Sequence, residues 1–184
     1  MAKLVSKTYG DALFELALEE EKIDVFQDEI LFANDVFNEN KELQTLMNHP
    51  KVNKEEKKEV IKNIFTGKVS DDTVGFLLII VEKGRFGEID AIFDYFFEKV
   101  REYKNIGRAF IQTAVELNDS QKENVKNRLL ETTRYEKMEI EYSVEPALIG
   151  GMIIRIGDRV VDSSIQTKLY EMKKDLSRIQ LKNV

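Results

Sequence analysis

The apolar residues of this 184-residue chain change their spacing once, near residues 105–107, and that change divides the chain in two. From Val5 to Ala17, and in most segments that follow, apolar side chains recur every three or four positions, which is the spacing of an amphipathic helix. In residues 109–117 they alternate one by one, which is the spacing of a strand. We therefore expect a mainly α protein, with a six-helix bundle over residues 1–105 and a small α+β domain over residues 106–184.

Capping residues, proline and glycine set the expected helix boundaries in the first half. Asn53 can cap one helix, and Gly84 can end the helix that starts at Ser70 or Asp71. This last helix is apolar on almost all sides, so we expect it to be central in the bundle or covered by another protein. To within a few residues, the expected helices cover residues 3–18, 23–38, 43–47, 53–65, 70–82 and 88–103.

The second half contains short alternating segments and two helical ones. A helix is expected after Asn118 and a final helix from about Ser164, and strands are expected at residues 109–117, 138–144, 148–156 and 159–161. The final helix carries apolar residues spaced four and three apart, as in a coiled coil, at Ile165, Leu169, Met172, Leu176 and Ile179. This seam can pack on the small sheet or on a helix of a partner protein, and its spacing fits both.

The composition excludes several kinds of site. The chain has no cysteine and a single histidine, His49, so it forms no disulfide and lacks the ligand set of a structural zinc site. A net charge of −6 gains no counterion-release energy from a phosphate backbone, which argues against nucleic acid as a partner. The longest apolar run, Phe76 to Val81, is far shorter than the roughly 20 residues of a membrane span, and no targeting segment is expected at the start.

No catalytic set of side chains is recognisable. The acidic clusters of the helical half are expected at helix ends or on solvent-exposed helix faces, where paired carboxylates do not acquire different pKa values. Ser163 and Ser164 are expected to cap a helix, because His49 is the only imidazole that could activate them. Gly150 and Gly151 lack the context of a phosphate loop and indicate a bulge or a close backbone approach. We expect no enzyme activity, no cofactor, no metal and no small-molecule substrate.

Three stretches carry a resemblance to one family. Tyr9 to Ala17 is similar to its opening Tyr-Ala-x-Ala-Leu-Phe-x-x-Ala helix, with Gly10 where the family usually has Ala, and Leu78 to Arg85 is similar to the end of its fifth helix. The third and most specific stretch, Val144 to Ser164, contains the signature residues Pro146, Leu148, Ile149, Gly150, Gly151, Arg155, Gly157 and Asp158. In this order and spacing the chain resembles the delta subunit of bacterial F-type ATP synthases, a relative of the mitochondrial oligomycin-sensitivity conferral protein.

The resemblance implies a non-catalytic stator subunit that couples proton flow to ATP synthesis. It implies that the helical domain, residues 1–105, binds the amphipathic N-terminal segment of an alpha subunit. The α+β domain, residues 106–184, would contact the b subunits of the peripheral stalk. It further implies a peripheral location on the cytoplasmic side of a bacterial plasma membrane, without insertion into the membrane.

Within the helical domain, the apolar surface of the fifth helix suggests a groove for the alpha segment between the first and fifth helices. We expect this groove to be lined by Tyr9, Ala12, Leu13, Phe76, Leu77 and Ile80. The same residues can equally belong to the core. Two other functions stay open: a general helical adaptor, or an RNA-binding protein that uses the glycine pair.

Overall fold

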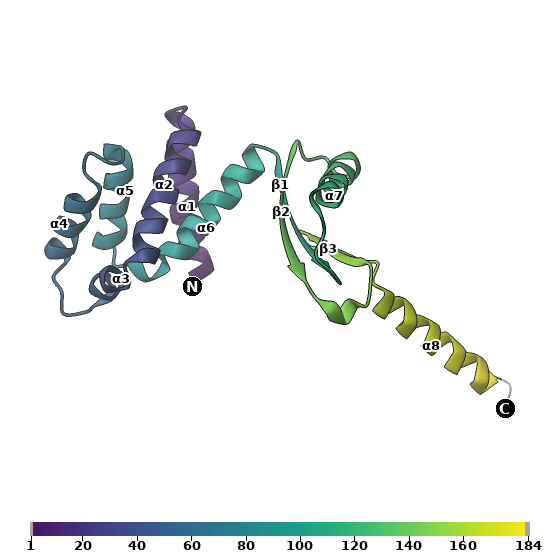
Figure 1. The fold of residues 1–184 in the computed structure, drawn as a ribbon. Coiled ribbons are helices and arrows are strands. Elements are labelled where there is room, and N and C mark those ends of the chain that lie inside the picture. The colour runs from purple at the N-terminus through teal and green to yellow at the C-terminus, as the bar shows by residue number, and fades with distance from the viewer. Residues whose placement is uncertain (1, 183–184) are drawn as a thin grey trace. The chain divides into compact units, whose positions relative to one another are not determined.

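The computed structural model describes residues 2–182 and divides the chain into two compact units, residues 1–101 and 102–184 (Figure 1). The first unit is helical. The second combines helices with a four-stranded sheet. The expectation of a mainly α chain with a small sheet in its second half is confirmed.

Six α-helices and one 3-10 turn (η1) begin in the described part of the first unit. Helix α5 starts after the N-cap Ser70, whose side chain accepts a hydrogen bond from Thr73 N, because this bond satisfies a free amide of the first turn. Gly67 and Gly84, after α4 and α5, have positive φ angles, a conformation that glycine adopts without strain. The elements are α1 Ala2–Glu19, α2 Ile23–Glu39, α3 Lys41–Asn48, α4 Lys54–Phe65, α5 Asp71–Glu82, η1 Phe86–Glu88 and α6 Ile89–Tyr103.

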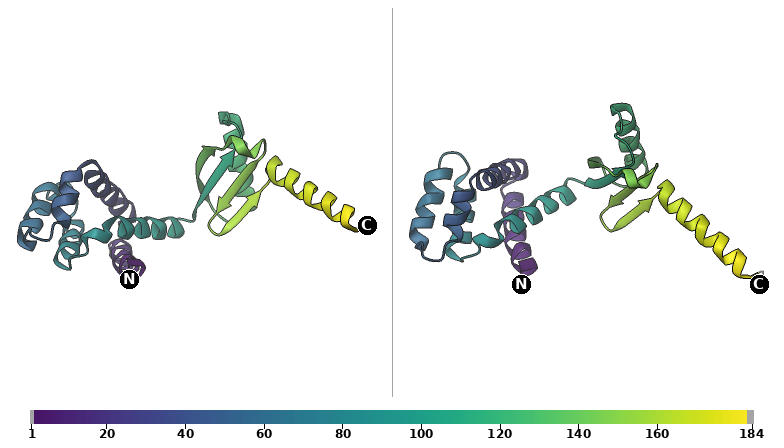
Figure 2. Two further views of the ribbon diagram at one scale, coloured as in Figure 1. Left: turned by 90° about the horizontal axis from the view of Figure 1, so that it is seen from below. Right: turned by 60° about the horizontal axis from the view of Figure 1, so that its bottom comes forward.

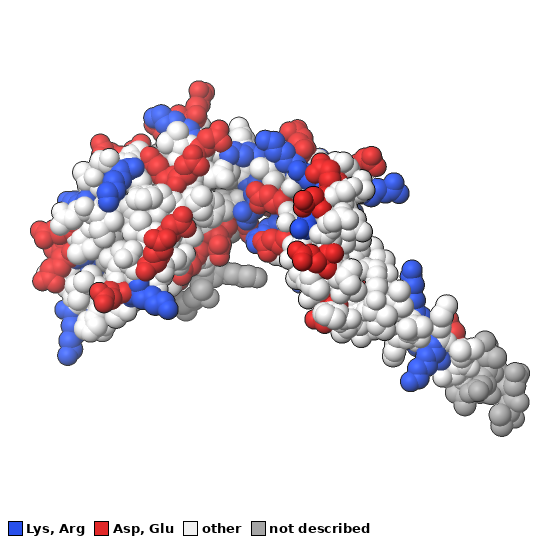
Figure 3. All heavy atoms as spheres, in the orientation of Figure 1, with Lys and Arg blue, Asp and Glu red and all other residues white. Residues whose placement is uncertain are grey.

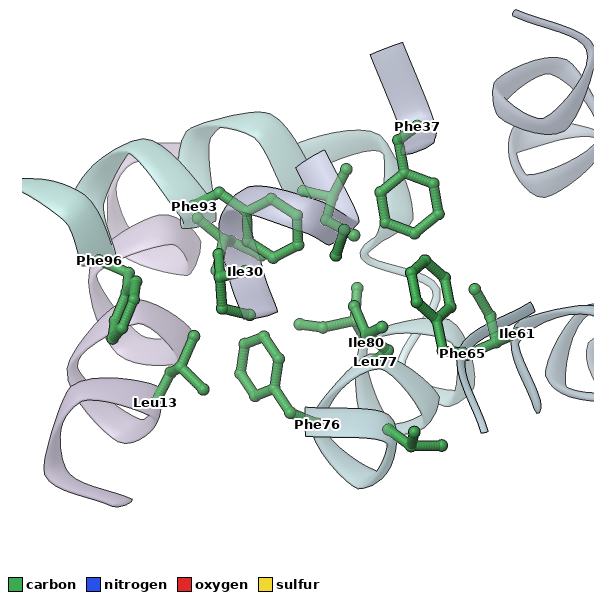
Figure 4. Close-up of a cluster of buried hydrophobic side chains, with 14 of the residues drawn as sticks. Leu13, Ile30, Phe37, Ile61, Phe65, Phe76, Leu77, Ile80, Phe93 and Phe96 are labelled. Atoms are coloured by element: carbon green, nitrogen blue, oxygen red, sulfur yellow. The ribbon is translucent and has the colours of Figure 1, made fainter. Parts of the chain in front are cut away.

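Phenylalanine rings dominate the core of the first unit (Figure 4). Phe37 of α2 packs against Phe65 of α4 and against Phe86 of η1, with ring centroids 5.4 and 5.1 Å apart. Phe93 and Phe96 bring α6 to the same core. Edge-to-face and tilted ring contacts of this kind add to the free energy gained by burying the rings. Helix α5 has six buried residues, although Ile79 on the same helix is 50% exposed.

The second unit is built on a mixed sheet with strand order β2-β1-β3-β4. Strands β1 and β2 are parallel and are joined through α7, whereas β3 is antiparallel to both β1 and β4. The elements are β1 Ile106–Thr113, α7 Asp119–Thr132, β2 Lys137–Val144, the 3-10 turn η2 Pro146–Leu148, β3 Met152–Ile156, β4 Arg159–Asp162 and α8 Ile165–Lys182.

Helix α7 packs on one face of this sheet, and both views in Figure 2 show it beside that face. Leu129 of α7 lies in a buried cluster with Ala109 and Ile111 of β1 and Met138 of β2. Asn118 and the side chain of Gln121 form a capping box that starts the helix. The residues of β1 therefore alternate between this cluster and the opposite face.

Two expected strands differ from the observed ones. The first was expected at residues 109–117, but β1 covers Ile106–Thr113, because its pairing with β2 and β3 ends at Thr113. The strand expected at residues 148–156 begins only at Met152, because η2 and the two glycines precede it. None of the helices in the described part of the chain is long and apolar enough to span a bilayer.

Candidate partner-binding surfaces

The six residues expected to line a groove lie at different depths. Leu13 of α1 and Leu77 and Ile80 of α5 are fully buried in the core, and Phe76 is almost so. Figure 4 shows Leu13 and Phe76 pointing into the space between their helices. Of the remaining two, Tyr9 is half-buried and Ala12 is exposed. Helices α1 and α5 therefore share a core at these positions. Of the six residues predicted to line the groove, only those of α1 reach the surface.

A stripe along one flank of α1 reaches that surface. It consists of Val5, Tyr9, Ala12 and Leu16, spaced by four, three and four residues, and we call it the α1 stripe. Its three larger members are half-buried and pack against the core. On α5 the side chain of Ile79 is 50% exposed. Sequence reasoning assigned Val5, Leu16 and Ile79 to helices without placing them at a partner surface, although the spacing of the stripe is visible in the sequence.

Hydrogen bonds to two carboxylates, those of Glu29 and Asp11, hold α5 and α1 in position. The carboxylate of Glu29 on α2 accepts hydrogen bonds from Ser70 N at 2.8 Å, from Ser70 Oγ at 2.6 Å and from Thr73 Oγ1 at 2.5 Å, which fastens the start of α5 to α2. The Tyr95 hydroxyl of α6 donates to Asp11 Oδ1 of α1 at 2.9 Å. Hydrogen bonds to a carboxylate are stronger than neutral ones, so these contacts restrain both helices.

The apolar seam of α8 is exposed. Leu169 is 51% exposed, and Met172 and Leu176 are still more so. In Figure 3 the visible described surface of α8 is mainly uncharged, with a few basic side chains on it. The possibility that the described part of this seam packs on the sheet is therefore wrong. The side chain of Ile179, the last residue of the expected seam, lies outside the described residues.

The signature segment positions the start of α8. Leu148 of η2 is buried, and Gly151, with a φ of 76°, lies so close to the backbone of Ser163 that a β-carbon would collide with the Ser163 carbonyl. The amide of Ile165 donates to Gly150 O at 2.9 Å. The close backbone approach expected at the glycine pair is therefore observed, and it connects the η2 loop to the first residue of α8.

Other signature residues lie around the β3–β4 hairpin. Gly157 takes a positive φ of 55° in the hairpin turn, next to Asp158. Pro146 opens η2, and Arg155 lies on β3 with its side chain exposed on the face opposite α7. Ile149 combines a φ of 67° with 62% exposure, an unusual backbone conformation for a β-branched residue.

A hydrogen-bond cap starts α8. Asp162 Oδ1 accepts from Ser164 N at 2.8 Å, and Asp162 Oδ2 accepts from Thr167 Oγ1 at 2.7 Å. Ser164 Oγ in turn accepts from Thr167 N at 3.2 Å. The hydrogen bonds to Asp162 hold its pKa below the ordinary value, and the bond from the Thr167 hydroxyl contributes most, followed by those from Ser164. Ser164, expected to cap a helix rather than to act as a nucleophile, caps the first turn of α8. The hydroxyl of Ser163, expected to do the same, instead donates to the carbonyl of Met152 on β3 at 2.8 Å.

Comparison with known proteins gives the family. A family model described as ATP synthase delta (OSCP) subunit matches residues 5–176. A protein of Lachnoclostridium phytofermentans named ATP synthase subunit delta is 56% identical over 181 residues, which cover 98% of this chain and 100% of that protein. This chain belongs to the ATP synthase delta (OSCP) subunit family.

Further relatives and one solved structure agree. The ATP synthase subunit delta of Alkaliphilus oremlandii is 34% identical, with 97% of this chain and 99% of that protein covered. A chain in the structure of the Toxoplasma gondii mitochondrial ATP synthase hexamer has a TM-score of 0.73 at 17% identity, and the match covers 93% of this chain and 96% of that one. The fold is thus shared at low sequence identity. The resemblance to this family is confirmed.

Proposed function

We propose that this chain is a non-catalytic stator subunit of an F-type ATP synthase. The observation that carries the proposal is that each unit of a delta-family chain offers an apolar helical surface, the α1 stripe on the first and the α8 seam on the second. Two such surfaces suit a connector, because separate contacts act together and give a long-lived joint. In this role the chain holds the catalytic head against the torque of the rotor, so that proton flow drives ATP synthesis.

The first unit acts as one helical bundle that binds the N-terminal segment of an alpha subunit. An amphipathic helix binds through side chains spaced by three and four residues, and the α1 stripe has that spacing. Ala12 is small and lets such a helix approach closely. Leu13, Phe76, Leu77 and Ile80 form the floor beneath it, because they are buried in the core that supports the stripe.

The second unit binds the b subunits of the peripheral stalk through the α8 seam. Three exposed seam residues, Leu169, Met172 and Leu176, follow the three- and four-residue spacing of coiled-coil packing. The flanking Lys168 and Lys173 favour a partner helix with acidic residues beside its apolar seam. The chain therefore reaches the bacterial plasma membrane through the stalk, on the cytoplasmic side, and needs no nucleotide or metal of its own.

Reconstitution tests the proposal. Membranes of the same organism are stripped of the catalytic sector and of this chain, and the purified chain is added back with the catalytic sector. We expect restored docking and proton-coupled ATP synthesis. If the head docks and couples equally well without the chain, the stator role is refuted and a general adaptor is favoured.

Two substitutions with matched controls test the surfaces in the same assay. Ala12→Asp places a charge on the α1 stripe and Leu176→Asp places one on the α8 seam, and each should reduce coupling at least tenfold while the circular dichroism spectrum stays unchanged. The controls are Ala91→Asp, at an exposed alanine of α6, and Tyr170→Asp, at an exposed residue off the α8 seam. Calorimetry with a synthetic peptide of the alpha N-terminal segment should show the loss for Ala12→Asp alone. Unchanged peptide affinity would refute the α1 assignment.

A further inference from the structure

The methionines of this chain are its most readily oxidised side chains, because the sequence has no cysteine. The four whose side chains the structure describes differ sharply in exposure. Met47 is 2% exposed, Met138 is 7% exposed and Met152 is half-buried, whereas Met172 is 63% exposed. The first three pack in or against the cores of their units. A dissolved oxidant therefore reaches the sulfur of Met172 first.

Met172 lies in the middle of the α8 seam. Leu169 precedes it by three residues and Leu176 follows it by four, so the three exposed side chains lie on one side of the helix. Met172 belongs to neither of the buried clusters of the two units. A chemical change of its side chain therefore alters the seam without unpacking a core.

Oxidation turns this apolar side chain into a polar one. The thioether sulfur gives a lone pair to one oxygen of hydrogen peroxide, so that an S–O bond forms and the O–O bond breaks. The second oxygen takes the proton of the first and leaves as water, so the sulfur loses two electrons and the peroxide gains them. The product is a sulfoxide, and burying its polar oxygen in an apolar contact without a hydrogen-bond donor is unfavourable.

We propose that Met172 is an oxidation site that controls the α8 contact, where the thioether form binds the stalk helix and the sulfoxide form binds it weakly. The inference rests on the proposed function, which assigns the α8 seam to the b subunits. Methionine sulfoxide reductases return the sulfoxide to methionine, so the change is reversible. Because a bound stalk helix covers Met172, oxidation acts mainly on the chain before it joins the stalk.

Peptide mapping by mass spectrometry tests the selectivity of the oxidation. The purified full chain is treated with dilute hydrogen peroxide, and the sulfoxide at each methionine is followed with time. Met172 should be oxidised at least tenfold faster than Met47 and Met138. Binding of the soluble part of the b subunit of the same organism should slow oxidation at Met172 at least fivefold. Equal rates at Met172 and at the two buried methionines would refute the inference.

A calorimetric titration with the same b fragment tests the consequence for binding. Peroxide treatment of the unaltered chain should weaken binding at least tenfold with an unchanged circular dichroism spectrum, and methionine sulfoxide reductases should restore it. Met172→Leu keeps an apolar side chain without sulfur, so peroxide should change its affinity less than twofold. Met152→Leu is the matched control, because it removes a half-buried methionine outside the seam and should leave the effect of peroxide intact.

The outcomes separate this inference from the function on which it rests. If the untreated and the oxidised chain bind the fragment equally well, the seam tolerates the sulfoxide and only the inference is refuted. A loss of binding in peroxide-treated Met172→Leu would place the effect at another side chain, which also refutes it. If the untreated chain does not bind the fragment at all, the stalk assignment of the proposed function fails together with the inference.

Discussion

Gly10 is the position where the structure makes the sharpest quantitative prediction. A β-carbon at Gly10 would lie 2.5 Å from Tyr95 Cδ1 and 3.3 Å from Tyr95 Cγ, whereas carbon atoms in contact are normally about 3.5–4.0 Å apart. The Tyr95 ring occupies the space that an alanine methyl group would fill. This contact gives a physical reason for glycine at this position. The perturbation is Gly10→Ala, made with and without the Tyr95 ring.

The magnitude follows from opposing effects. Alanine inside a helix is favoured over glycine by about 1 kcal/mol. Against this, the ring must move by roughly 1 Å, and overpacking of this kind costs about 1–3 kcal/mol. The displacement also strains the hydrogen bond from Tyr95 to Asp11, a bond worth about 1 kcal/mol when it is partly exposed. We therefore expect Gly10→Ala to destabilise the first unit by about 1–2 kcal/mol, and to stabilise it by about 1 kcal/mol in a Tyr95→Ala background.

Native-state hydrogen exchange of α1 and α6 measures these values within the full chain, because it reports the free energy of opening of each segment separately. Tyr95→Phe is the informative control, since it removes the hydroxyl and keeps the ring. Gly10→Ala should remain destabilising in that background. The reasoning is refuted if Gly10→Ala stabilises the unaltered chain, or if its effect is the same with and without the ring.

Two further predictions concern the second unit. Gly151→Ala should lower the free energy of unfolding, measured by chemical denaturation, by about 2–4 kcal/mol, because a strained left-handed backbone and a collision with Ser163 act together. Gly157→Ala, with open space around it, should lower it by about 1 kcal/mol. Equal losses for the two variants would contradict the close approach. Because its hydrogen bonds lower the folded pKa of Asp162, this carboxylate contributes stability that is complete well above the ordinary value of 3.8 and is lost as the pH falls through the lower folded value. Carbon-13 NMR should show a carboxyl midpoint below 3.8, and a midpoint at or above it would refute the cap.

Part of the candidate site could be recognised in the sequence because its signals are local, but only Tyr9 and Ala12 of the six predicted groove residues reach the surface. The spacing of the α1 stripe, the helix cap at Ser164 and the close approach at the glycine pair each follow from a few neighbouring residues. The boundaries of β1 and β3 were less predictable. An alternating pattern continues beyond Thr113, and hydrogen bonds with a distant strand, not the pattern, decide where a strand ends.

The sequence by itself determined the two halves, the helical segments and the signature segment, because periodicity and capping act within a few residues of one another. Only the tertiary structure decided which apolar residues are covered. Phe76 and Ile79 belong to the same apolar helix, yet Phe76 is buried and Ile79 is half exposed. Likewise, the spacing of the α8 seam was compatible with packing on the sheet and with packing on a helix of a partner protein. A pattern shows which side of a helix is apolar, but burial depends on what packs there, and that is a property of contacts between residues far apart in the chain.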